Sequence, residues 1–452
     1  MSVRYDLVVV GTGNAGQLAA TVAREAGLRV AIVEGREVGG TCALRGCVPK
    51  KVLAAAGEAM DLIRRAAVHA IEVGPATLNW TRLIARERTF VAGVPDDVKT
   101  DLLKKGLDVV EGRARFVGRD ALAVTGRDEP LLADAFVVAS GSVPRPLAFP
   151  GGDTLLTSDD LLELRELPAS VAFVGAGVIA FELAHVMARA GARVTLLEMG
   201  PRPLLGLDAD AVARLVEATI ALGIDVRVGV RVEAVEAEAA GARVVRYAQG
   251  EQTHAIRVVA VAHGAGRIPA LDDLDLNAAG VTVVQGRPEL DEAHRSRSNP
   301  AIWFAGDAVP GTQQLSALAT YEGRLVGRNI VRHEARAPDY SAVPSAVFAV
   351  PALASVGPTE EQAHARGLSF EARVNDMRTW RSARTYGEEV AWAKVLVDRA
   401  ADRIVAAHLV GHGAAETINA FALAIRHGIS LTALKEGVFA YPTFHSDLKF
   451  LM

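Results

Sequence analysis

The sequence predicts an α/β fold in which two copies of one strand–turn–helix–strand unit are followed by a C-terminal α+β domain. The first observation is a repeat: VVVGTGNAGQLAATVAREAGLRVAIVEG (8–35) aligns without a gap with AFVGAGVIAFELAHVMARAGARVTLLEMG (172–200). The second is composition, because 50% of the residues are hydrophobic and only 5% aromatic, as in the Ala-, Val- and Leu-rich cores of stacked α/β layers. The third is the segment after residue 338, which alternates as strands do and ends with two helical stretches.

Length and charge limit the kind of protein. A chain of 452 residues is expected to form about three domains of roughly 150 residues each. The formal net charge of -4 gives no reason to expect nucleic acid or a membrane surface as a partner. The N-terminus MSVRYDLVVVGTG lacks the features of a signal peptide, and no apolar run reaches about 18 residues. We therefore expect a soluble cytoplasmic protein, in which a cysteine pair is more often catalytic or metal-binding than a structural staple.

The repeat carries the glycine fingerprint of dinucleotide sites. The first two glycines of each copy permit a tight turn and let a pyrophosphate approach a helix N-terminus, and a small third residue allows close helix–strand packing. An acid about 20 residues further on can accept hydrogen bonds from a ribose. These positions are Gly11, Gly13, Gly16 and Glu34 in the first copy and Gly175, Gly177, Ala180 and Glu198 in the second. One such fingerprint is weak, but two in register predict two Rossmann-like dinucleotide-binding domains.

The remaining elements follow in chain order. Residues 50–70 and 81–106 are expected to be helices, and FVVASGSVPRPLAFPG (136–151) a strand that runs into a Pro/Gly-rich link. AIWFAGDAV (301–309) is expected to be a buried strand, followed by the helix-like LSALATYEGRLVGRNIV (315–331). The predicted division has four parts. Residues 1–148 form the first part of the first nucleotide-binding domain, and residues 149–265 form the second nucleotide-binding domain. Residues 266–335 belong again to the first, or to a central, domain, and residues 336–452 form the C-terminal domain.

The two cysteines of the chain stand together in GGTCALRGCVPKK (39–51). In a straight helix Cys42 and Cys47 would be about 7.5 Å apart along the axis, so a disulfide between them needs a bent segment, which Gly46 can supply. The pair follows Glu34 closely and is therefore expected beside the redox ring of whatever nucleotide binds there. Two unrelated buried thiols remain an alternative. So does half of a metal site, although the sequence has no second Cys/His cluster at ligand spacing.

These motifs resemble those of the flavin-dependent pyridine nucleotide–disulfide oxidoreductases, the family of glutathione reductase, dihydrolipoamide dehydrogenase and mercuric reductase. The resemblance covers essentially the whole chain and includes GGTCALRGCVPKK, GAGVIAFELA, GAGRIPALDDLDL, FAGDAV, GPTEEQA and AHLVGHGAAETINAFALAIRHG. It implies FAD at the first fingerprint and NADH or NADPH at the second. It also implies a homodimer, formed through a C-terminal dimerisation domain whose last segment reaches the partner's active site.

The resemblance assigns roles to individual residues. Cys47 would be the sulfur nearest the flavin, and Cys42 the one that attacks the acceptor after hydride transfer to FAD has opened the disulfide. Lys50, paired with Glu182, would lie by the isoalloxazine, and Asp307 would hold the ribityl chain. The resemblance also assigns cofactor contacts to Gly40, Thr41, Ala114, Ser140, Gly141, Arg145, Arg267, Gly306 and Leu315, with Arg267 near the nicotinamide nucleotide.

Two departures concern the nicotinamide site. Many relatives carry a Tyr that gates the nicotinamide pocket, whereas this chain has Val178, as mercuric reductases do. Members specific for the phosphorylated nucleotide place arginines after the second strand, whereas Glu198 is followed here by MGPRPL. A carboxylate repels a 2′-phosphate, so NADH is favoured, while Ala180 and a swing of Arg202 leave NADPH open.

A third departure concerns the acceptor. The family's C-terminal HPTxxE reads YPTFHS (441–446) here, so the usual acid–base His and its Glu are replaced by Tyr441 and Ser446. A phenol with a pKa near 10 is a poor proton acceptor for a thiol, and His445 is a candidate substitute. The acceptor therefore stays open. It could be a disulfide, either of a free molecule or of a lipoyl-type group in a larger complex, or a metal ion such as mercuric ion. A diaphorase, transhydrogenase or quinone reductase that uses the flavin directly is a further alternative.

Overall fold

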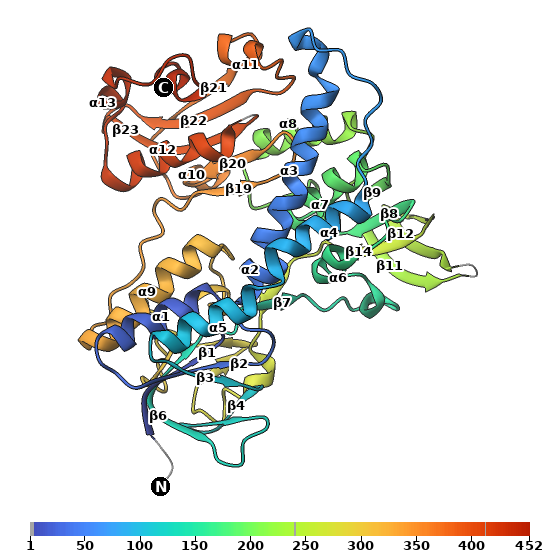
Figure 1. Ribbon diagram of the computed structural model, residues 1–452. Coiled ribbons are helices and arrows are strands. Elements are labelled where there is room, and N and C mark those ends of the chain that lie inside the picture. Colours follow the sequence, from blue (N-terminus) through green and yellow to red (C-terminus); the bar gives the residue numbers. More distant parts are fainter. Residues whose placement is uncertain (1–3, 239–240, 412) are drawn as a thin grey trace. The chain divides into compact units, whose positions relative to one another are not determined.

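The computed structural model describes residues 4–238, 241–411 and 413–452 (Figure 1). It divides into two compact units, each made of three chain segments. Unit 1 comprises Met1–Pro49, Glu87–Arg145 and Arg267–Asp339, and unit 2 comprises Lys50–Arg86, Pro146–Gly266 and Tyr340–Met452. The chain passes between the units five times, and two of these passages fall within helices, α3 (Cys47–Arg64) and α4 (Trp80–Val91).

Unit 1 contains a central sheet and the helices that cover it (Figure 1). Its strands are β1 (Arg4–Val10), β2 (Val30–Glu34), β3 (Asp108–Glu111), β4 (Ala114–Gly118), β5 (Ala121–Val124), β6 (Leu131–Val138), β7 (Ser142–Pro144), β15 (Arg267–Pro269), β16 (Val283–Val284), β17 (Arg287–Pro288) and β18 (Ile302–Phe304). Its helices and 3₁₀ turns are α1 (Asn14–Glu25), α2 (Gly40–Arg45), α5 (Val94–Lys104), η4 (Asp272–Leu274), η5 (Gly306–Ala308) and α9 (Ser316–Arg332).

The sheet of unit 1 has the order β3-β2-β1-β6-β5-β4, and β18 also pairs with β6. Strands β3, β2, β1, β6 and β18 run parallel, whereas β4 and β5 form an antiparallel hairpin. Strand β1 is buried on both faces: Leu7 and Val9 belong to one core with α1 and α9, and Val8 and Val10 belong to a second core with β4 and β5. This continuous apolar strand is what a parallel sheet covered on both faces requires.

Unit 2 contains three sheets. Its strands are β8 (Ser170–Val174), β9 (Arg193–Leu197), β10 (Asp225–Arg227), β11 (Val230–Ala237), β12 (Arg243–Gln249), β13 (Gln252–Val258), β14 (Ala260–His263), β19 (Ser345–Val347), β20 (Leu353–Val356), β21 (Glu371–Asp376), β22 (Trp392–Asp398) and β23 (Arg403–Val410). Its helices and 3₁₀ turns are η1 (Ala66–His69), η2 (Gly152–Thr154), α6 (Ser158–Glu163), α7 (Val178–Arg189), α8 (Ala209–Ala221), α10 (Glu360–Ala365), α11 (Arg381–Thr385), α12 (Ala414–His427), α13 (Leu431–Glu436) and η6 (Phe444–Phe450).

The second nucleotide-binding pattern forms the parallel sheet β10-β9-β8-β14, and a three-stranded antiparallel sheet β11-β12-β13 follows it. The C-terminal region forms an antiparallel sheet of order β19-β20-β23-β22-β21, whose core includes residues of α12 and α13. The predicted fold class, α/β with two Rossmann-like domains and a C-terminal α+β domain, is confirmed.

The helix expected over 81–106 is wrong in one respect, because the segment forms two helices, α4 and α5. Helix α5 begins after Gly93 and has a proline in its first turn. Pro95 has no N–H to donate and its ring would clash with the carbonyl oxygen four residues earlier in a continuous helix, so the first helix stops at Val91. The helix expected over 50–70 likewise ends early, at Arg64, and continues as the 3₁₀ turn η1.

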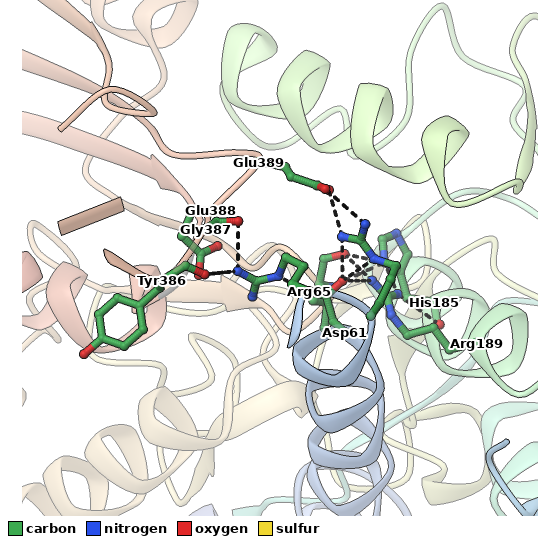
Figure 2. A network of polar contacts seen from close by, with 10 residues as sticks. Asp61, Arg65, His185, Arg189, Tyr386, Gly387, Glu388 and Glu389 are labelled. Atoms are coloured by element: carbon green, nitrogen blue, oxygen red, sulfur yellow. Dashed lines mark hydrogen bonds and ion pairs between the residues drawn. The ribbon is translucent and has the colours of Figure 1, made fainter. Parts of the chain in front are cut away.

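A buried carboxylate, Asp61, ties α3 to other parts of unit 2 (Figure 2). Asp61 forms ion pairs with Arg65 at 2.9 Å, Arg64 at 3.2 Å and Arg189 of α7 at 3.4 Å. Burial raises the pKa of a carboxyl group, but the three guanidinium groups outweigh it and hold the pKa of Asp61 below its usual value. Arg65 also bonds the carbonyl oxygens of Tyr386 and Gly387, which anchors the segment before β22 to α3.

Candidate functional site

The two glycine fingerprints have the same backbone geometry. Gly11 and Gly175 adopt positive φ angles of 104° and 92°. The Gly11 N–H donates to Val33 O and the Gly175 N–H to Leu197 O, both at 2.7 Å. A side chain at Gly11 would be strained, since its Cβ would lie 2.3 Å from the carbonyl oxygen of Ala139. The turn therefore depends on glycine in both copies.

The third position of each fingerprint sets how closely the helix packs on the strand. A Cβ at Gly16 would lie 1.9 Å from Gly11 O, so only glycine fits there. In the second copy Ala180 is fully buried. The space for its methyl group exists because the neighbouring position is Gly264, where a Cβ would lie 2.8 Å from the Ala180 Cβ.

Helices α1 and α7 both begin at a glycine N-cap, Gly13 and Gly177, with no side-chain cap and no acidic residue in the first turn. Their first N–H groups are therefore not capped by a side chain, and the positive end of each helix dipole faces the turn. A Cβ at Gly13 would meet nothing within 4 Å, so the approach to the α1 terminus is open. This arrangement fits the pyrophosphate of a dinucleotide.

The acids of the two fingerprints are held in the same way. Glu34 accepts hydrogen bonds from the Thr12 N–H at 2.9 Å and from the Arg36 N–H at 2.9 Å. Glu198 accepts them from the Ala176 N–H at 2.8 Å and from the Gly200 N–H at 2.7 Å. Each carboxylate is thus fixed at the end of its second strand, with lone pairs left for a ribose hydroxyl.

Arg202 follows Glu198 but does not extend from its loop. Its guanidinium donates to four carbonyl oxygens of residues 203–207, at 3.0 to 3.4 Å, and lies 3.7 Å from Glu361. A swing toward a nucleotide would break these four hydrogen bonds, and of the four acceptors Leu204 O would keep the Leu207 N–H as a donor. Val178 is exposed at the start of α7, with no aromatic ring at that position.

Asp307 lies in unit 1 next to Ser142. Ser142 Oγ donates to Asp307 Oδ2 at 3.0 Å, and Arg267 donates to Ser142 Oγ at 3.0 Å and to Ser142 O at 2.6 Å. Burial raises the pKa of Asp307 above its usual value. Gly306, with φ 67°, donates its N–H to the buried Glu322 at 2.7 Å, which fixes the turn that presents Asp307.

Most of the other residues expected to contact the flavin nucleotide lie at loop or element ends of unit 1. Ser140 Oγ donates to Ala270 O at 2.7 Å, and Gly141 O accepts from the Ala270 N–H at 2.9 Å. A Cβ at Gly40 would lie 2.4 Å from Gly13 Cα, so the start of α2 touches the fingerprint turn. The remaining positions are Thr41 in α2, Ala114 at the start of β4, Arg145 after β7 and Leu315 at the N-cap of α9.

The two cysteines lie on either side of a bend. Cys42 is in α2, Gly46 ends that helix with φ -145° and ψ -110°, and Cys47 begins α3. The structure holds the pair as free thiols. Hydrogen bonds from Cys47, Ser316 and Asn14 outweigh the opposing effect of burial and lower the pKa of Cys42 to about 6. Cys42 is therefore largely a thiolate at neutral pH.

In unit 2, Lys50 and Glu182 form the pair that the sequence predicted. The Lys50 ammonium lies 2.8 Å from Glu182 Oε1, and Glu182 is buried on α7. The same oxygen accepts the Phe348 N–H at 2.9 Å, and the ammonium lies 4.2 Å from the centre of the Phe348 ring. The cation is therefore held by two groups, a carboxylate and an aromatic ring.

The C-terminal residues have other partners than the family motif implies. Tyr441 is 67% exposed and its hydroxyl accepts a hydrogen bond from Arg381 Nη1 at 2.7 Å. Ser446 is buried and forms a capping box with Thr443 at the start of η6. His445 is half-buried in the same turn. Ser446 is therefore committed to capping the start of η6 and does not orient a base.

Sequence reasoning did not identify Asn14, Ser316, Phe348 or Arg381. Asn14 stands inside the first fingerprint and Ser316 directly follows Leu315. Neither spacing nor residue type connects them to Cys42, since the three positions are separated by 28 and 274 residues. Only the fold brings them together.

Comparison with known proteins identifies the family. Residues 5–323 match the model described as pyridine nucleotide-disulphide oxidoreductase, and residues 343–451 match the dimerisation domain of the same family. The chain belongs to the pyridine nucleotide-disulphide oxidoreductases. It is an enzyme of the flavoprotein disulfide reductase type, in which electrons pass from a nicotinamide nucleotide through FAD to a redox-active disulfide of the enzyme, and the comparisons do not determine the final acceptor. The C-terminal match supports a homodimer.

Several relatives align over nearly their full length. Glutathione reductase of Burkholderia cepacia is 34% identical over 93% of this chain and 92% of its own. Dihydrolipoyl dehydrogenase of Chlorobaculum tepidum is 30% identical over 99% of this chain and 96% of its own, and mercuric reductase of Staphylococcus aureus is 30% identical over 98% and 81%. Among solved structures, a Cu(II) complex of the HOCl-induced flavoprotein disulfide reductase RclA from Escherichia coli has a TM-score of 0.88 at 25% identity, with 99% of each chain covered. None of the described helices is long and apolar enough to cross a membrane.

Proposed function

We propose that this enzyme uses NADH to reduce, through FAD and the Cys42–Cys47 pair, a thiol-binding metal ion rather than a disulfide. This proposal rests mainly on the C-terminal motif, in which Tyr441 hydrogen-bonds Arg381 and Ser446 belongs to a capping box. The His and Glu that form the acid–base pair in relatives are replaced by Tyr441 and Ser446, whose hydrogen bonds go to other residues. The chemistry at the thiols must therefore proceed without that pair.

Disulfide reduction suffers most from this loss. Attack on a disulfide needs a thiolate and then a proton for the thiol that leaves, and a positioned acid–base group typically contributes about 10²–10⁴-fold. Cys42 meets the first need, since its pKa of about 6 leaves it ionised at neutral pH. Tyr441 and Ser446, which stand where the family has its acid–base pair, have other hydrogen bonds and are not positioned for the second. Acceptors that release no thiol avoid the second step.

A metal ion that binds thiolates is such an acceptor. Transfer of two electrons from one NADH reduces two Cu(II) ions to two Cu(I), or one Hg(II) to Hg(0), and releases NAD⁺ and one proton. Soft metal ions favour thiolate ligands. Two relatives support this choice, because mercuric reductase is a sequence relative and the RclA structure is a Cu(II) complex.

We assign FAD to the fingerprint of unit 1 and its neighbours Asp307, Ser142 and Gly40. Bound FAD supplies a redox ring that takes two electrons from the nicotinamide and passes them to a disulfide. Lys50, fixed by Glu182 and Phe348, supplies a cation that favours an electron-rich ring beside it. Cys47 is the sulfur nearest the ring, and Cys42 delivers electrons to the acceptor.

We assign NADH to the fingerprint of unit 2. Glu198 is fixed where a 2′-hydroxyl would bind and repels a 2′-phosphate. Arg202 is the basic side chain expected to compensate, and its carbonyl partners hold it inside its own loop. We further propose a homodimer and, from the cysteine content, a cytoplasmic location.

The test compares acceptors in the purified flavoprotein. Steady-state turnover of NADH is measured with Cu(II), Hg(II), a quinone, glutathione disulfide and lipoamide, in the wild type and in Cys42→Ser. The proposal expects metal reduction to exceed disulfide reduction by at least about tenfold and to be lost in Cys42→Ser. Metal or quinone turnover that survives in Cys42→Ser would instead establish direct use of the flavin. Faster turnover of either disulfide than of the metals would also overturn the proposal.

A further inference from the structure

A hydrogen-bond chain in unit 1 ends at the sulfur of Cys42. Asn14 Nδ2 donates to Ser316 Oγ at 2.5 Å, and Cys42 Sγ lies 3.1 Å from the same oxygen. We propose that Ser316, held by Asn14, is a positioning residue that stabilises the Cys42 thiolate in place of the missing histidine. The proposal rests on the proposed role of Cys42 as the attacking thiol, but the hydrogen bonds themselves do not depend on the acceptor.

The direction of the bonds can follow the charge of the sulfur. In the thiol form, Cys42 S–H and Asn14 N–H both donate to Ser316 Oγ, which has two lone pairs. When Cys42 loses its proton, the hydroxyl of Ser316 can turn and donate to the sulfur while it still accepts from Asn14. A donor bonded to the hydroxyl oxygen polarises the O–H bond and strengthens its bond to the anion. Both protonation states are therefore satisfied without movement of the backbone.

The fold fixes the two residues with respect to each other. Asn14 is the first residue of α1 and Ser316 the first residue of α9. These helices pack closely, since a Cβ at Gly323 of α9 would lie 2.2 Å from the carbonyl oxygen of Ala15. Their N-termini cannot separate without loss of that contact. The hydroxyl is thus held in place before the thiolate forms.

Helix capping does not explain Ser316. The N-cap of α9 is Leu315, and the helix has no side-chain cap. Ser316 uses its hydroxyl for Asn14 and Cys42 instead. The low pKa of Cys42 agrees with this role, although the hydrogen bond from Cys47 is the larger contribution. Ser316 and Asn14 are therefore expected to account for part of the stabilisation of the thiolate.

The test measures alkylation of Cys42 by iodoacetamide in the reduced holoenzyme, followed by peptide mass spectrometry from pH 5 to 10. Because a hydrogen bond to a charged group contributes about 1.5 kcal/mol or more, Ser316→Ala is expected to slow alkylation of Cys42 about tenfold at pH 5 and to move the midpoint of the pH profile upward by about one unit. The rates should converge at high pH. Ser316→Thr, which keeps the hydroxyl, should restore the low midpoint.

Asn14→Ala provides the second arm, with a smaller shift in the same direction. Asn14 also hydrogen-bonds Cys42 directly, so the double variant should shift at least as far as Ser316→Ala alone. Ser158→Ala, at the first position of α6, is the matched control and should leave the profile unchanged. An unchanged profile in Ser316→Ala, or a midpoint that stays raised in Ser316→Thr, would overturn the proposal. Alkylation needs neither a nicotinamide nor a metal ion. Its result therefore does not depend on whether the proposed acceptor is correct.

Discussion

Glu34 and Glu198 occupy equivalent positions in two units of the chain, 164 residues apart, and each accepts one N–H from its glycine turn and one from two residues beyond itself. The donors, Thr12 and Arg36 in one unit and Ala176 and Gly200 in the other, are offset by the same number. The repeat is therefore preserved in these two backbone hydrogen bonds, whereas the bond from the Thr12 hydroxyl to Glu34 has no counterpart at Ala176. The sequence differences between the copies then bear on which nucleotide each copy binds.

NADH is expected to be the better donor because of Glu198. The wild type should show a kcat/KM at least about tenfold higher with NADH than with NADPH, and Glu198→Ala should reduce that ratio. Arg202→Ala should change the ratio little, since Arg202 is engaged by its own loop. Steady-state kinetics with both donors provide the measurement. A wild-type preference for NADPH that disappears in Arg202→Ala would contradict the assignment.

Gly13→Ala should separate cofactor binding from folding. The position has ordinary backbone angles and space for a methyl group, so the variant should fold with an unchanged apoprotein Tm. The methyl group would nevertheless occupy the approach to the α1 N-terminus, and FAD affinity should fall by about tenfold or more, which is about 1.4 kcal/mol. Gly74→Ala, also in open space, is the control and should retain FAD. Gly16→Ala, with its Cβ 1.9 Å from a carbonyl oxygen, should lower stability itself.

The roles of the two sulfurs can be separated by absorption spectroscopy. We expect that two-electron reduction produces a long-wavelength charge-transfer band from the Cys47 thiolate to the oxidised flavin. Cys42→Ser has no disulfide to reduce, so its Cys47 thiolate should show the band already in the oxidised enzyme, and Cys47→Ser should lack the band. A band that survives in Cys47→Ser would exchange the two assignments.

Local patterns account for much of what the sequence could predict. The glycine turns and the bend at Gly46 follow from residue types a few positions apart, and the pairing of Lys50 with Glu182 followed from the family motifs. The four-part domain division and the roles of the site residues stay predictions. The Asn14–Ser316–Cys42 chain could not be predicted, because packing of α1 on α9 creates it. The break at Gly93 was missed because periodicity continued across Pro95, whose missing N–H decided the local structure.

Glu388 gives stability a defined pH dependence. Burial is the main reason that its pKa is raised to about 7, although the pair with Arg65, at 3.3 Å, opposes the rise (Figure 2). A carboxyl group with a raised pKa holds its proton longer in the folded than in the unfolded chain. Its stabilising contribution is therefore complete below about pH 4.5 and lost as the pH rises to about 7. Glu388→Gln should remove this part of the slope in a denaturant titration between pH 5 and 8, whereas Glu389→Gln, whose group has a lowered pKa, should not.

The acid–base deficit can be repaired only where the structure has room for a base and its partner. Tyr441→His places an imidazole at the position of the family's base, but the guanidinium of Arg381 lies at that position and disfavours the protonated ring. The family's Glu would fall at Ser446, where a carboxylate would be buried and the capping box lost, so Ser446→Glu should lower Tm. Because Arg381 contacts residue 441 directly, Arg381→Glu is the better source of an orienting carboxylate.

Turnover of glutathione disulfide should therefore rise modestly in Tyr441→His and further in the Tyr441→His/Arg381→Glu variant. A positioned base should increase this turnover by at most about 10²-fold. Tyr441→Phe removes the hydroxyl without adding a base and should give no increase, which makes it the control. Metal reduction should change little in any of these variants, since it releases no thiol. Brisk wild-type turnover of glutathione disulfide that persists in His445→Ala would contradict the reasoning, because the enzyme would then protonate its leaving thiol without either imidazole.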